Sequence, residues 1–209
     1  MLAGIYVEDA GQPVVTTILL VRHAAHDDLG RVLSGRSSTP LNRNGEREAL
    51  RLARHLQQDM IGRIEASPCL RTQQTASIIG GQIGLEVKAV AALDEIDFGE
   101  WTGRTFSELA DDPLWDAWNS ARATAVPPRG EGMAAAVERT VAHLEGKAGA
   151  DEGTALCVTH GDVIRGVVCH YLGVDLDHIH RFDVDPASVT RLELFPGAAR
   201  LSYINRAFA

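Results

Sequence analysis

Cysteine is scarce in this chain, with three residues among 209, at Cys69, Cys157 and Cys169. The number is odd, and no two of the three have the spacing of a metal or redox motif. This usage excludes a small scaffold held together by disulfides. It predicts small, buried, unpaired thiols in a protein of a reducing compartment.

Long apolar runs and targeting signals are also missing. No segment approaches the roughly 18 apolar residues that a membrane-spanning helix needs. Glu8 and Asp9 stand in a region that lacks the basic, apolar and small-residue order of a signal peptide. No Ser/Gly linker, composition break or internal repeat divides the chain. We therefore expect a single domain over residues 1–209, a cytoplasmic location and no membrane partner.

Positive charge is not in excess either. The formal net charge is −8 and the isoelectric point lies near 5.4. Such a balance argues against nucleic acid and anionic membranes as partners, because both carry dense negative charge. An acidic protein with a few focused arginines suits a small anionic substrate better than a polyanion.

Two short apolar runs are each followed by a histidine. The run 14–21 is followed by Arg22 and His23, and the run 154–159 by His160. Both runs are short and uninterrupted, which is typical of strands buried on both faces. Ligands of open α/β sheets bind at the carboxyl ends of the strands, and a helix start after His160 offers amides to an anion. The sequence thus predicts a two-histidine site for an anionic ligand.

Two further segments supply charged groups. Pro68 is well placed to open a helix that carries Arg71 one turn in, which would offer a second arginine to the same anion. The segment 93–103 combines carboxylates with glycines and aromatic residues, a composition suited to a segment that covers a substrate. One of its carboxylates is a candidate proton donor.

The remaining pattern alternates strands with helices. Asn42 is placed to cap a helix, Thr105 begins a capping-box sequence, and Asp112 precedes Pro113 at a third helix start that leads into Trp115 and Trp118. The helix after Asn42 is predicted to have an apolar face made of Ala49, Leu52, Ala53, Leu56 and Met60. A later helix is predicted to have one made of Met133, Val137, Val141 and Leu144. The segments 188–194 and 200–204 are predicted to form a hairpin of strands at the edge of the sheet. We predict an α/β fold, a three-layer α/β/α sandwich with a mainly parallel sheet.

Over nearly its whole length the chain resembles the histidine phosphatase, or phosphoglycerate mutase-like, superfamily, in its phosphatase-type branch. The resemblance depends on motifs that occur in the family's order: Arg22-His23, Ser67-Pro68 with Arg71-Thr72, Glu95 within 95–103, and His160-Gly161 with Val163-Ile164-Arg165. Ala24 stands where many members have glycine, and the loop 25–38 lacks the usual polar positions, so contacts beyond the phosphate are expected to differ.

This resemblance implies a role for each charged group. His23 would be the nucleophile that forms a phosphohistidine, a task that suits a neutral imidazole with a reference pKa of about 6.5. Arg22 and Arg71 would clamp the phosphate, since a guanidinium pairs two phosphate oxygens at once. His160 would donate a hydrogen bond to the transferring group. Glu95 would protonate the leaving group and then activate water.

Other residues are weaker candidates. Ser34, Gly35 and Gly161 are expected to add to the phosphate site, and no metal or cofactor is implied. Asp94, Asp97 and Glu100 are alternatives to Glu95 because they are also carboxylic and close by. His26 either lines the pocket or is a polar loop residue, and the His178-x-His180 pair is either a metal site or a surface feature.

Three functions fit these residues. The first is a metal-independent phosphomonoester hydrolase that acts through phosphohistidine on a small phosphorylated metabolite. The second is a phosphoglycerate mutase-type phosphoryl transferase, which is less favoured because Ile96-Asp97-Phe98 follows Glu95 where mutases have Arg-His-Tyr. The third is a catalytically silent module that binds phosphorylated ligands. A homodimer is possible.

Overall fold

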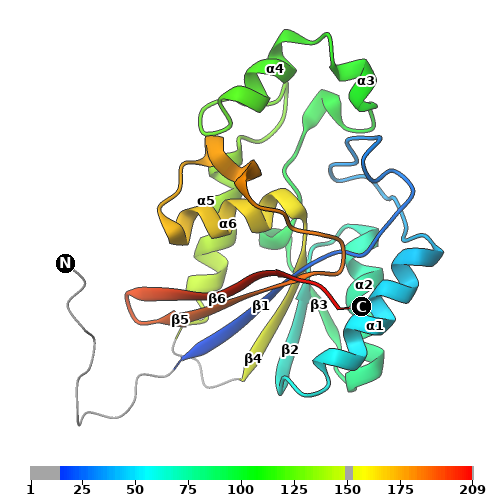
Figure 1. The fold of residues 1–209 in the computed structure, drawn as a ribbon, viewed down its shortest axis with the longest axis vertical. Helices are drawn as coiled ribbons and strands as arrows, with labels where there is room; N and C mark the ends of the chain where they lie inside the picture. The colour runs from blue at the N-terminus through cyan, green and yellow to red at the C-terminus, as the bar shows by residue number, and fades with distance from the viewer. Residues whose placement is uncertain (1–14, 149–152, 209) are drawn as a thin grey trace.

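The protein is built around one six-stranded sheet with the strand order β3-β2-β4-β1-β5-β6. The computed structural model describes residues 15–148 and 153–208 (Figure 1). The strands are β1 (Thr16–Arg22), β2 (Ile61–Ala66), β3 (Val87–Ala89), β4 (Thr154–Thr159), β5 (Val189–Phe195) and β6 (Ala198–Arg206). The first four are parallel neighbours, and β5 and β6 complete an antiparallel edge hairpin. The predicted mainly parallel sheet and its hairpin are confirmed.

Helices cover both faces of this sheet. They are α1 (Arg43–Leu56), α2 (Leu70–Ile83), α3 (Phe106–Leu109), α4 (Pro113–Ser120), α5 (Met133–Glu145) and α6 (Gly161–Leu172), with 3-10 turns η1 (Ala91–Leu93), η2 (Gly99–Trp101) and η3 (Leu176–Arg181). Alternate β1 residues face opposite layers: Ile18 and Leu20 pack in the core with α5 and α6, and Leu19 and Val21 in the core with α1 and α2. The three-layer prediction is therefore correct.

Most of the predicted helix boundaries agree with the structure. The two exceptions are the end of α1 and the start of α2. Asn42 caps α1 by accepting a hydrogen bond from the amide of Gly45 at 2.9 Å. Met60 does not share the buried face of α1, because the helix ends at Leu56 and Met60 lies beyond it, 88% exposed and with a φ of 40°. Pro68 does not open α2; it precedes the N-cap, so Arg71 lies within the first turn.

A small cap stands over the carboxyl ends of the parallel strands. It consists of α3 and α4, which lie at the top of Figure 1, away from the sheet. Thr105 and Glu108 form the predicted capping box at the start of α3, and Asp112 caps α4 with Pro113 at its first position. The indole Nε1 of Trp101 donates to Asp112 at 3.0 Å, which fastens the cap to the body.

A buried ion-pair cluster joins the sheet to α5. Glu65 on β2 is 4% exposed and accepts hydrogen bonds from His143 at 2.7 Å and Lys147 at 2.8 Å. Burial alone would raise the pKa of this carboxyl, but the hydrogen bonds and charges of His143 and Lys147 outweigh burial and lower the pKa to about 2. The cluster therefore stabilises the fold only when Glu65 is ionised.

We expect Glu65→Gln to lower the free energy of unfolding at pH 7 by about 3 kcal/mol, because the pKa of Glu65 is depressed in the folded state. The contribution is complete above the unfolded pKa of 4.5 and is lost as the pH falls towards 2. Urea unfolding of both proteins at pH 7 and pH 3 measures it. A difference between the two proteins that does not shrink at pH 3 would contradict the ionic origin.

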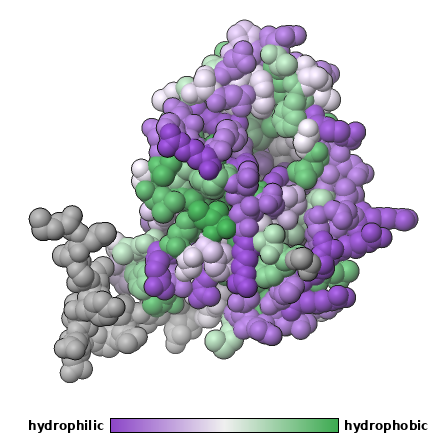
Figure 2. Space-filling view, viewed as in Figure 1, coloured by the Kyte–Doolittle hydropathy of each residue, from purple (hydrophilic) through white to green (hydrophobic). Residues whose placement is uncertain are grey.

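In the described ranges, no helix combines the length and apolar character needed to cross a bilayer. Most of the surface in the space-filling view is hydrophilic, and hydrophobic residues gather where α6 runs (Figure 2). Leu172, the last residue of α6, is 52% exposed.

Candidate active site

The two histidines predicted from the sequence meet at the carboxyl edge of the sheet. Strands β1 and β4 are parallel neighbours in which Arg22 lies opposite Thr159. The residues that follow are therefore side by side, and the amide of His23 donates to the carbonyl of Thr159 at 2.9 Å. The rings of His23 and His160 lie 5.3 Å apart, centroid to centroid. Parallel pairing thus brings together two residues far apart in the sequence.

His23 has the protonation state of a nucleophile. It is 3% exposed, and its Nδ1 lies 3.0 Å from the carbonyl oxygen of Ala24. A carbonyl only accepts hydrogen bonds, so Nδ1 carries the proton and Nε2 keeps its lone pair. Burial first, and then the charges of Arg71 and Arg22, hold the pKa of His23 well below its usual value. The imidazole is therefore neutral near pH 7.

Arg22 and Arg71 border the cleft beside His23. Nη2 of Arg71 donates to the carbonyl of Gly35 at 2.6 Å, and Nη1 of Arg22 donates to the carbonyl of Val184 at 2.6 Å. These bonds orient both guanidinium groups, and neither Nε has a partner among the described residues. Gly161 matters for this arrangement, because a Cβ there would lie 3.2 Å from Nε of Arg22.

His160 is completely buried and both of its ring nitrogens contact protein groups. The Ser67 hydroxyl donates to Asp94 at 2.7 Å and therefore accepts from Nε2 of His160 at 2.8 Å. Nδ1 of His160 is then the acceptor of a hydrogen bond from Arg71 at 3.0 Å. In this state His160 holds Arg71 and is not among the residues that line the cleft.

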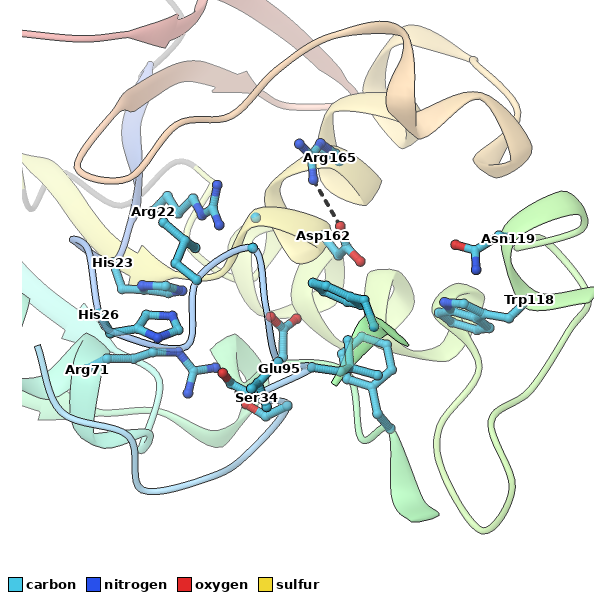
Figure 3. A pocket seen from close by; sticks show the side chains of 18 of the residues that line it. Arg22, His23, His26, Ser34, Arg71, Glu95, Trp118, Asn119, Asp162 and Arg165 are labelled. Atoms are coloured by element: carbon cyan, nitrogen blue, oxygen red, sulfur yellow. Dashed lines mark hydrogen bonds and ion pairs between the residues drawn. The ribbon is translucent and has the colours of Figure 1, made fainter. Parts of the chain in front are cut away.

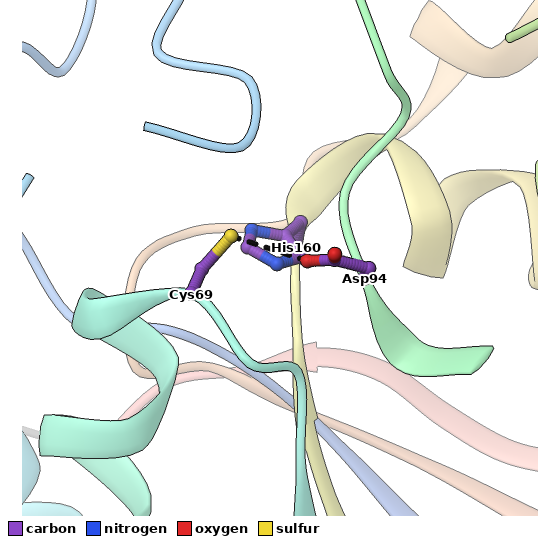
Figure 4. A group of neighbouring side chains, drawn as sticks. All are labelled: Cys69, Asp94 and His160. Atoms are coloured by element: carbon purple, nitrogen blue, oxygen red, sulfur yellow. Dashed lines mark hydrogen bonds between the residues drawn. The ribbon is translucent and has the colours of Figure 1, made fainter. Parts of the chain in front are cut away.

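Cys69, at the N-cap of α2, and Asp94, in the loop after η1, approach the same imidazole (Figure 4). Ligand atoms of Cys69, Asp94 and His160 all lie within 4.8 Å of one another. The Cys69 thiol donates to Asp94 at 3.1 Å, and burial raises the pKa of this thiol to about 11. Hydrogen bonds therefore join Cys69, Asp94 and His160 through the Ser67 hydroxyl and the Cys69 thiol, which keeps its proton at neutral pH.

Glu95 projects into the middle of the cleft (Figure 3). One carboxylate oxygen accepts from the amide of Ile96 at 3.0 Å, and the other lies 3.6 Å from Nδ1 of His160. Burial, followed by repulsion from Asp162, raises the pKa of Glu95 to about 7. Asp97 and Glu100, two of its alternatives in the sequence, have side chains 44% and 48% exposed, and neither lines the cleft.

The loop after β1 closes the end of the cleft next to His23. Ser34 lines it and is 8% exposed, with its hydroxyl unpartnered within the described ranges. His26 also lines the cleft, with its ring 5.1 Å from that of His23. Burial and the charge of Arg71 lower the pKa of His26 to about 4, so this ring is neutral as well.

The opposite wall of the cleft comes from the cap and the residues after it, from α6 and η3, and from Phe98 just before η2. The cleft encloses about 380 Å³, and this wall contains Phe98, Phe106, Trp115, Trp118, Asn119, Arg122, Asp162, Arg165 and His180. Figure 3 shows Trp118 and Asn119 across the cleft from the two histidines His23 and His26. His180 is thus a wall residue, and no group of metal-ligating side chains found in the described part of the chain includes it or His178.

A comparison with known families identifies the chain. The sequence model of the "Histidine phosphatase superfamily (branch 1)" matches residues 18–207. The chain belongs to this superfamily. The resemblance seen in the sequence is confirmed, and the match includes Arg22, His23, Arg71, Glu95 and His160 within its span.

Several relatives of this histidine phosphatase carry functional names. "Phosphoserine phosphatase 1" of Hydrogenobacter thermophilus is 30% identical, over 85% of this chain and 86% of the relative. "Probable phosphoglycerate mutase GpmB" of Klebsiella pneumoniae is 30% identical, over 84% of each chain. Among solved structures, Bacillus stearothermophilus YhfR has a TM-score of 0.86 and 27% identity, covering 92% of this chain and 98% of its own. Both a phosphatase and a mutase are therefore among the proteins that this chain resembles.

The sequence analysis missed the charged residues in the far wall of this histidine phosphatase. Arg122, Asp162 and Arg165 were given no role, although Asp162 and Arg165 directly follow the His160 motif. A signal was present, because a carboxylate in the first turn of α6 and an arginine three residues later lie on the same side of a helix. Arg122 carries no local signal, since only the folding of the cap places it there.

Proposed function

We propose that this histidine phosphatase hydrolyses small phosphomonoesters through a phosphoryl group carried on His23. The observation that carries the proposal is the His23 imidazole, which is neutral, held through Nδ1 and flanked by two arginines. A buried, uncharged imidazole between two cations is suited to attack a phosphate dianion that those cations hold. Enzymatic phosphoryl transfer depends chiefly on such positioning and charge stabilisation.

In the first step, Nε2 of His23 attacks phosphorus and the bond to the ester oxygen breaks. Arg22 and Arg71 hold the phosphate oxygens, and Ser34, Gly35 and Gly161 shape the same end of the cleft. Glu95 gives its proton to the departing alkoxide, which leaves as an alcohol. A pKa of about 7 supplies enough protonated Glu95 at neutral pH for this step.

In the second step, water attacks phospho-His23. Glu95, now ionised, takes a proton from this water, and the products are inorganic phosphate and free His23. His160 would donate to the phosphate through Nδ1, which requires a proton on that nitrogen and release of its bond to Arg71.

A mutase is the second candidate, because a relative named as a probable phosphoglycerate mutase shares 30% of its residues with this chain. It would use the same groups and return the phosphoryl group to an alcohol. Hydrolysis is favoured because Ile96, Asp97 and Phe98 follow Glu95, and Phe98 is 2% exposed against Trp118 in the hydrophobic core. The two candidate functions predict different requirements. A phosphatase releases inorganic phosphate without a bisphosphate primer, whereas a mutase needs the primer to transfer the phosphoryl group.

We also propose that the enzyme works in a reducing compartment. Cys69, Cys157 and Cys169 are all free and buried, which supports a cytoplasmic enzyme without disulfides. The homodimer and the single domain over residues 1–209 stay predictions.

The test is an incubation with a chromogenic aryl phosphate and a metal chelator, followed by an alkaline quench and mass spectrometry of the digested protein. We expect release of phosphate that resists the chelator, and a phosphoryl group on the peptide that contains His23. Phosphate release that stops with the chelator, or a phosphoryl group on another residue, would overturn the proposal. Phosphoryl transfer that requires a bisphosphate primer would select the mutase.

A further inference from the structure

His26 is a second imidazole beside the nucleophile, and it has no role in the hydrolysis proposed above. It is 5% exposed, and its ring lies 5.1 Å from the ring of His23, centroid to centroid. The ring of His160 lies 5.3 Å from that of His23, so the two imidazoles are about equally close to the nucleophile. Of these two, His26 lines the cleft and His160 does not (Figure 3).

The backbone on both sides of His26 is fixed to the start of α1. The amide of Ala25 donates to the carboxylate of Glu48 at 2.9 Å, and the carbonyl of Ala25 accepts from the amide of Asn42 at 3.1 Å. On the other side of His26, the carboxylate of Asp27 accepts from the side-chain amide of Asn42 at 3.0 Å. The loop therefore presents His26 to the cleft from a fixed backbone, which suits a group that must meet a ligand in one geometry.

One nitrogen of the His26 ring has no hydrogen-bond partner. Nδ1 of His26 is buried and unpaired among the described residues. His160, by contrast, uses both ring nitrogens, because Nε2 bonds to Ser67 and Nδ1 bonds to Arg71. Folded proteins pair most of their buried polar atoms, and His26 lines a cleft in which a bound ligand can provide the missing partner.

The His26 ring can act as a neutral hydrogen-bond donor. Burial, followed by the charge of Arg71, lowers the pKa of His26 to about 4, so the ring is uncharged at neutral pH. A neutral imidazole carries one N–H, which either nitrogen can hold. The oxygens of a phosphate dianion accept hydrogen bonds, so a bound phosphate favours the form of the ring whose N–H points at it.

The charges near His26 indicate that this ring lies beside the bound phosphate. Arg71 and Arg22 are both close enough to His26 for their charges to lower its pKa. In the proposed hydrolysis these two guanidinium groups hold the phosphate oxygens while His23 bonds to phosphorus. The two arginines already match the two charges of a phosphomonoester, and a neutral donor adds a contact without adding a third positive charge.

We propose that His26 is a further catalytic residue, which donates an N–H to an oxygen of the phosphoryl group as this group moves to and from His23. This inference rests on the proposed hydrolysis. The proton stays on the His26 ring throughout, and the hydrogen bond offsets negative charge on the phosphoryl oxygen. His160 can donate in this way only after its bond to Arg71 is released, whereas His26 needs no such change.

Two substitutions of His26 separate the donor from the shape of the side chain. Leucine and asparagine have a similar branched shape, but asparagine carries an amide N–H at about the distance of Nδ1 from the backbone. We expect His26→Leu to lower kcat/KM for an aryl phosphate by about 10- to 100-fold, the value of a hydrogen bond to a charged group. His26→Asn should recover most of this loss.

Binding of inorganic phosphate gives a second readout, which does not need turnover. Titration calorimetry should show an affinity that is lower in His26→Leu than in the unmodified protein by a similar factor. His26→Asn should bind phosphate nearly as well as the unmodified protein. Equal phosphate affinities in the unmodified protein and in His26→Leu would overturn the proposal whether or not the enzyme turns over.

The control is His55→Leu, which removes an exposed imidazole on α1. We expect it to change neither kcat/KM nor the affinity for phosphate. Equal losses of kcat/KM in His26→Leu and His26→Asn would mean that the ring is needed for its shape, and this result would overturn the proposal. Failure of the hydrolysis proposal is a different result, because the unmodified protein then does not turn over the aryl phosphate, while the His26 variants still differ in phosphate affinity.

Discussion

Replacing His23 with alanine should lower kcat for every phosphomonoester by on the order of 10⁵-fold or more, because the covalent route disappears. The loss should not depend on the leaving group, since Nε2 of His23 attacks phosphorus in every case. The measurement is phosphate release from an aryl and an alkyl ester at saturating substrate. The thermal unfolding temperature should change little, because the one hydrogen bond that the His23 ring makes with the described residues is to the carbonyl of Ala24.

Two other substitutions make this result specific. His26→Ala removes a second buried, neutral imidazole 5.1 Å away, and we expect a loss well below that of His23→Ala. Arg22→Ala removes one charge-assisted contact to phosphate and should cost about 10- to 100-fold. Similar modest losses in His23→Ala and Arg22→Ala would show that His23 is not the nucleophile.

The part of the site that lies on strand ends could be predicted from the sequence. Runs of buried β-branched residues identify β1 and β4, and parallel pairing makes their carboxyl ends meet. Because His23 and His160 each follow such a run, the sequence predicts that they lie side by side at the carboxyl edge of the sheet. Arg71 is predictable for a similar reason, because it begins a helix just after β2, a direct neighbour of β4 in the sheet.

The hydrogen bonds of His160 and the charged residues of the far wall could not be predicted in this way. His160 was expected to point a donor at the phosphate, but its Nε2 bonds to Ser67 and its Nδ1 accepts from Arg71. That arrangement depends on Asp94, which comes from a different loop and fixes the direction of the Ser67 hydroxyl. Contacts of this kind depend on tertiary packing and leave no periodic pattern in the sequence.

The Glu95→Gln variant should separate alkyl from aryl substrates. We expect kcat for an alkyl phosphate to fall by about 10²- to 10⁴-fold, because an alkoxide needs a proton as it leaves. A nitrophenyl ester should lose far less, since its leaving group is stable as an anion. In the unmodified enzyme, kcat for the alkyl ester should decrease as the pH rises through about 7, where Glu95 loses its proton. The pH profile in the variant should lack this step.

The neighbouring carboxylates provide the control for this assignment. Asp97→Asn and Glu100→Gln change side chains that are 44% and 48% exposed and lie outside the cleft, so both variants should keep the alkyl activity. Equal losses for alkyl and aryl esters in Glu95→Gln would mean that this side chain binds the phosphate or shapes the site instead of donating a proton. If Asp97→Asn lost activity toward alkyl esters alone, Asp97 would be the proton donor instead of Glu95. Burial decides between these carboxylates, because Glu95 is buried in the cleft and its pKa is raised to about 7, whereas the side chains of Asp97 and Glu100 are about half exposed.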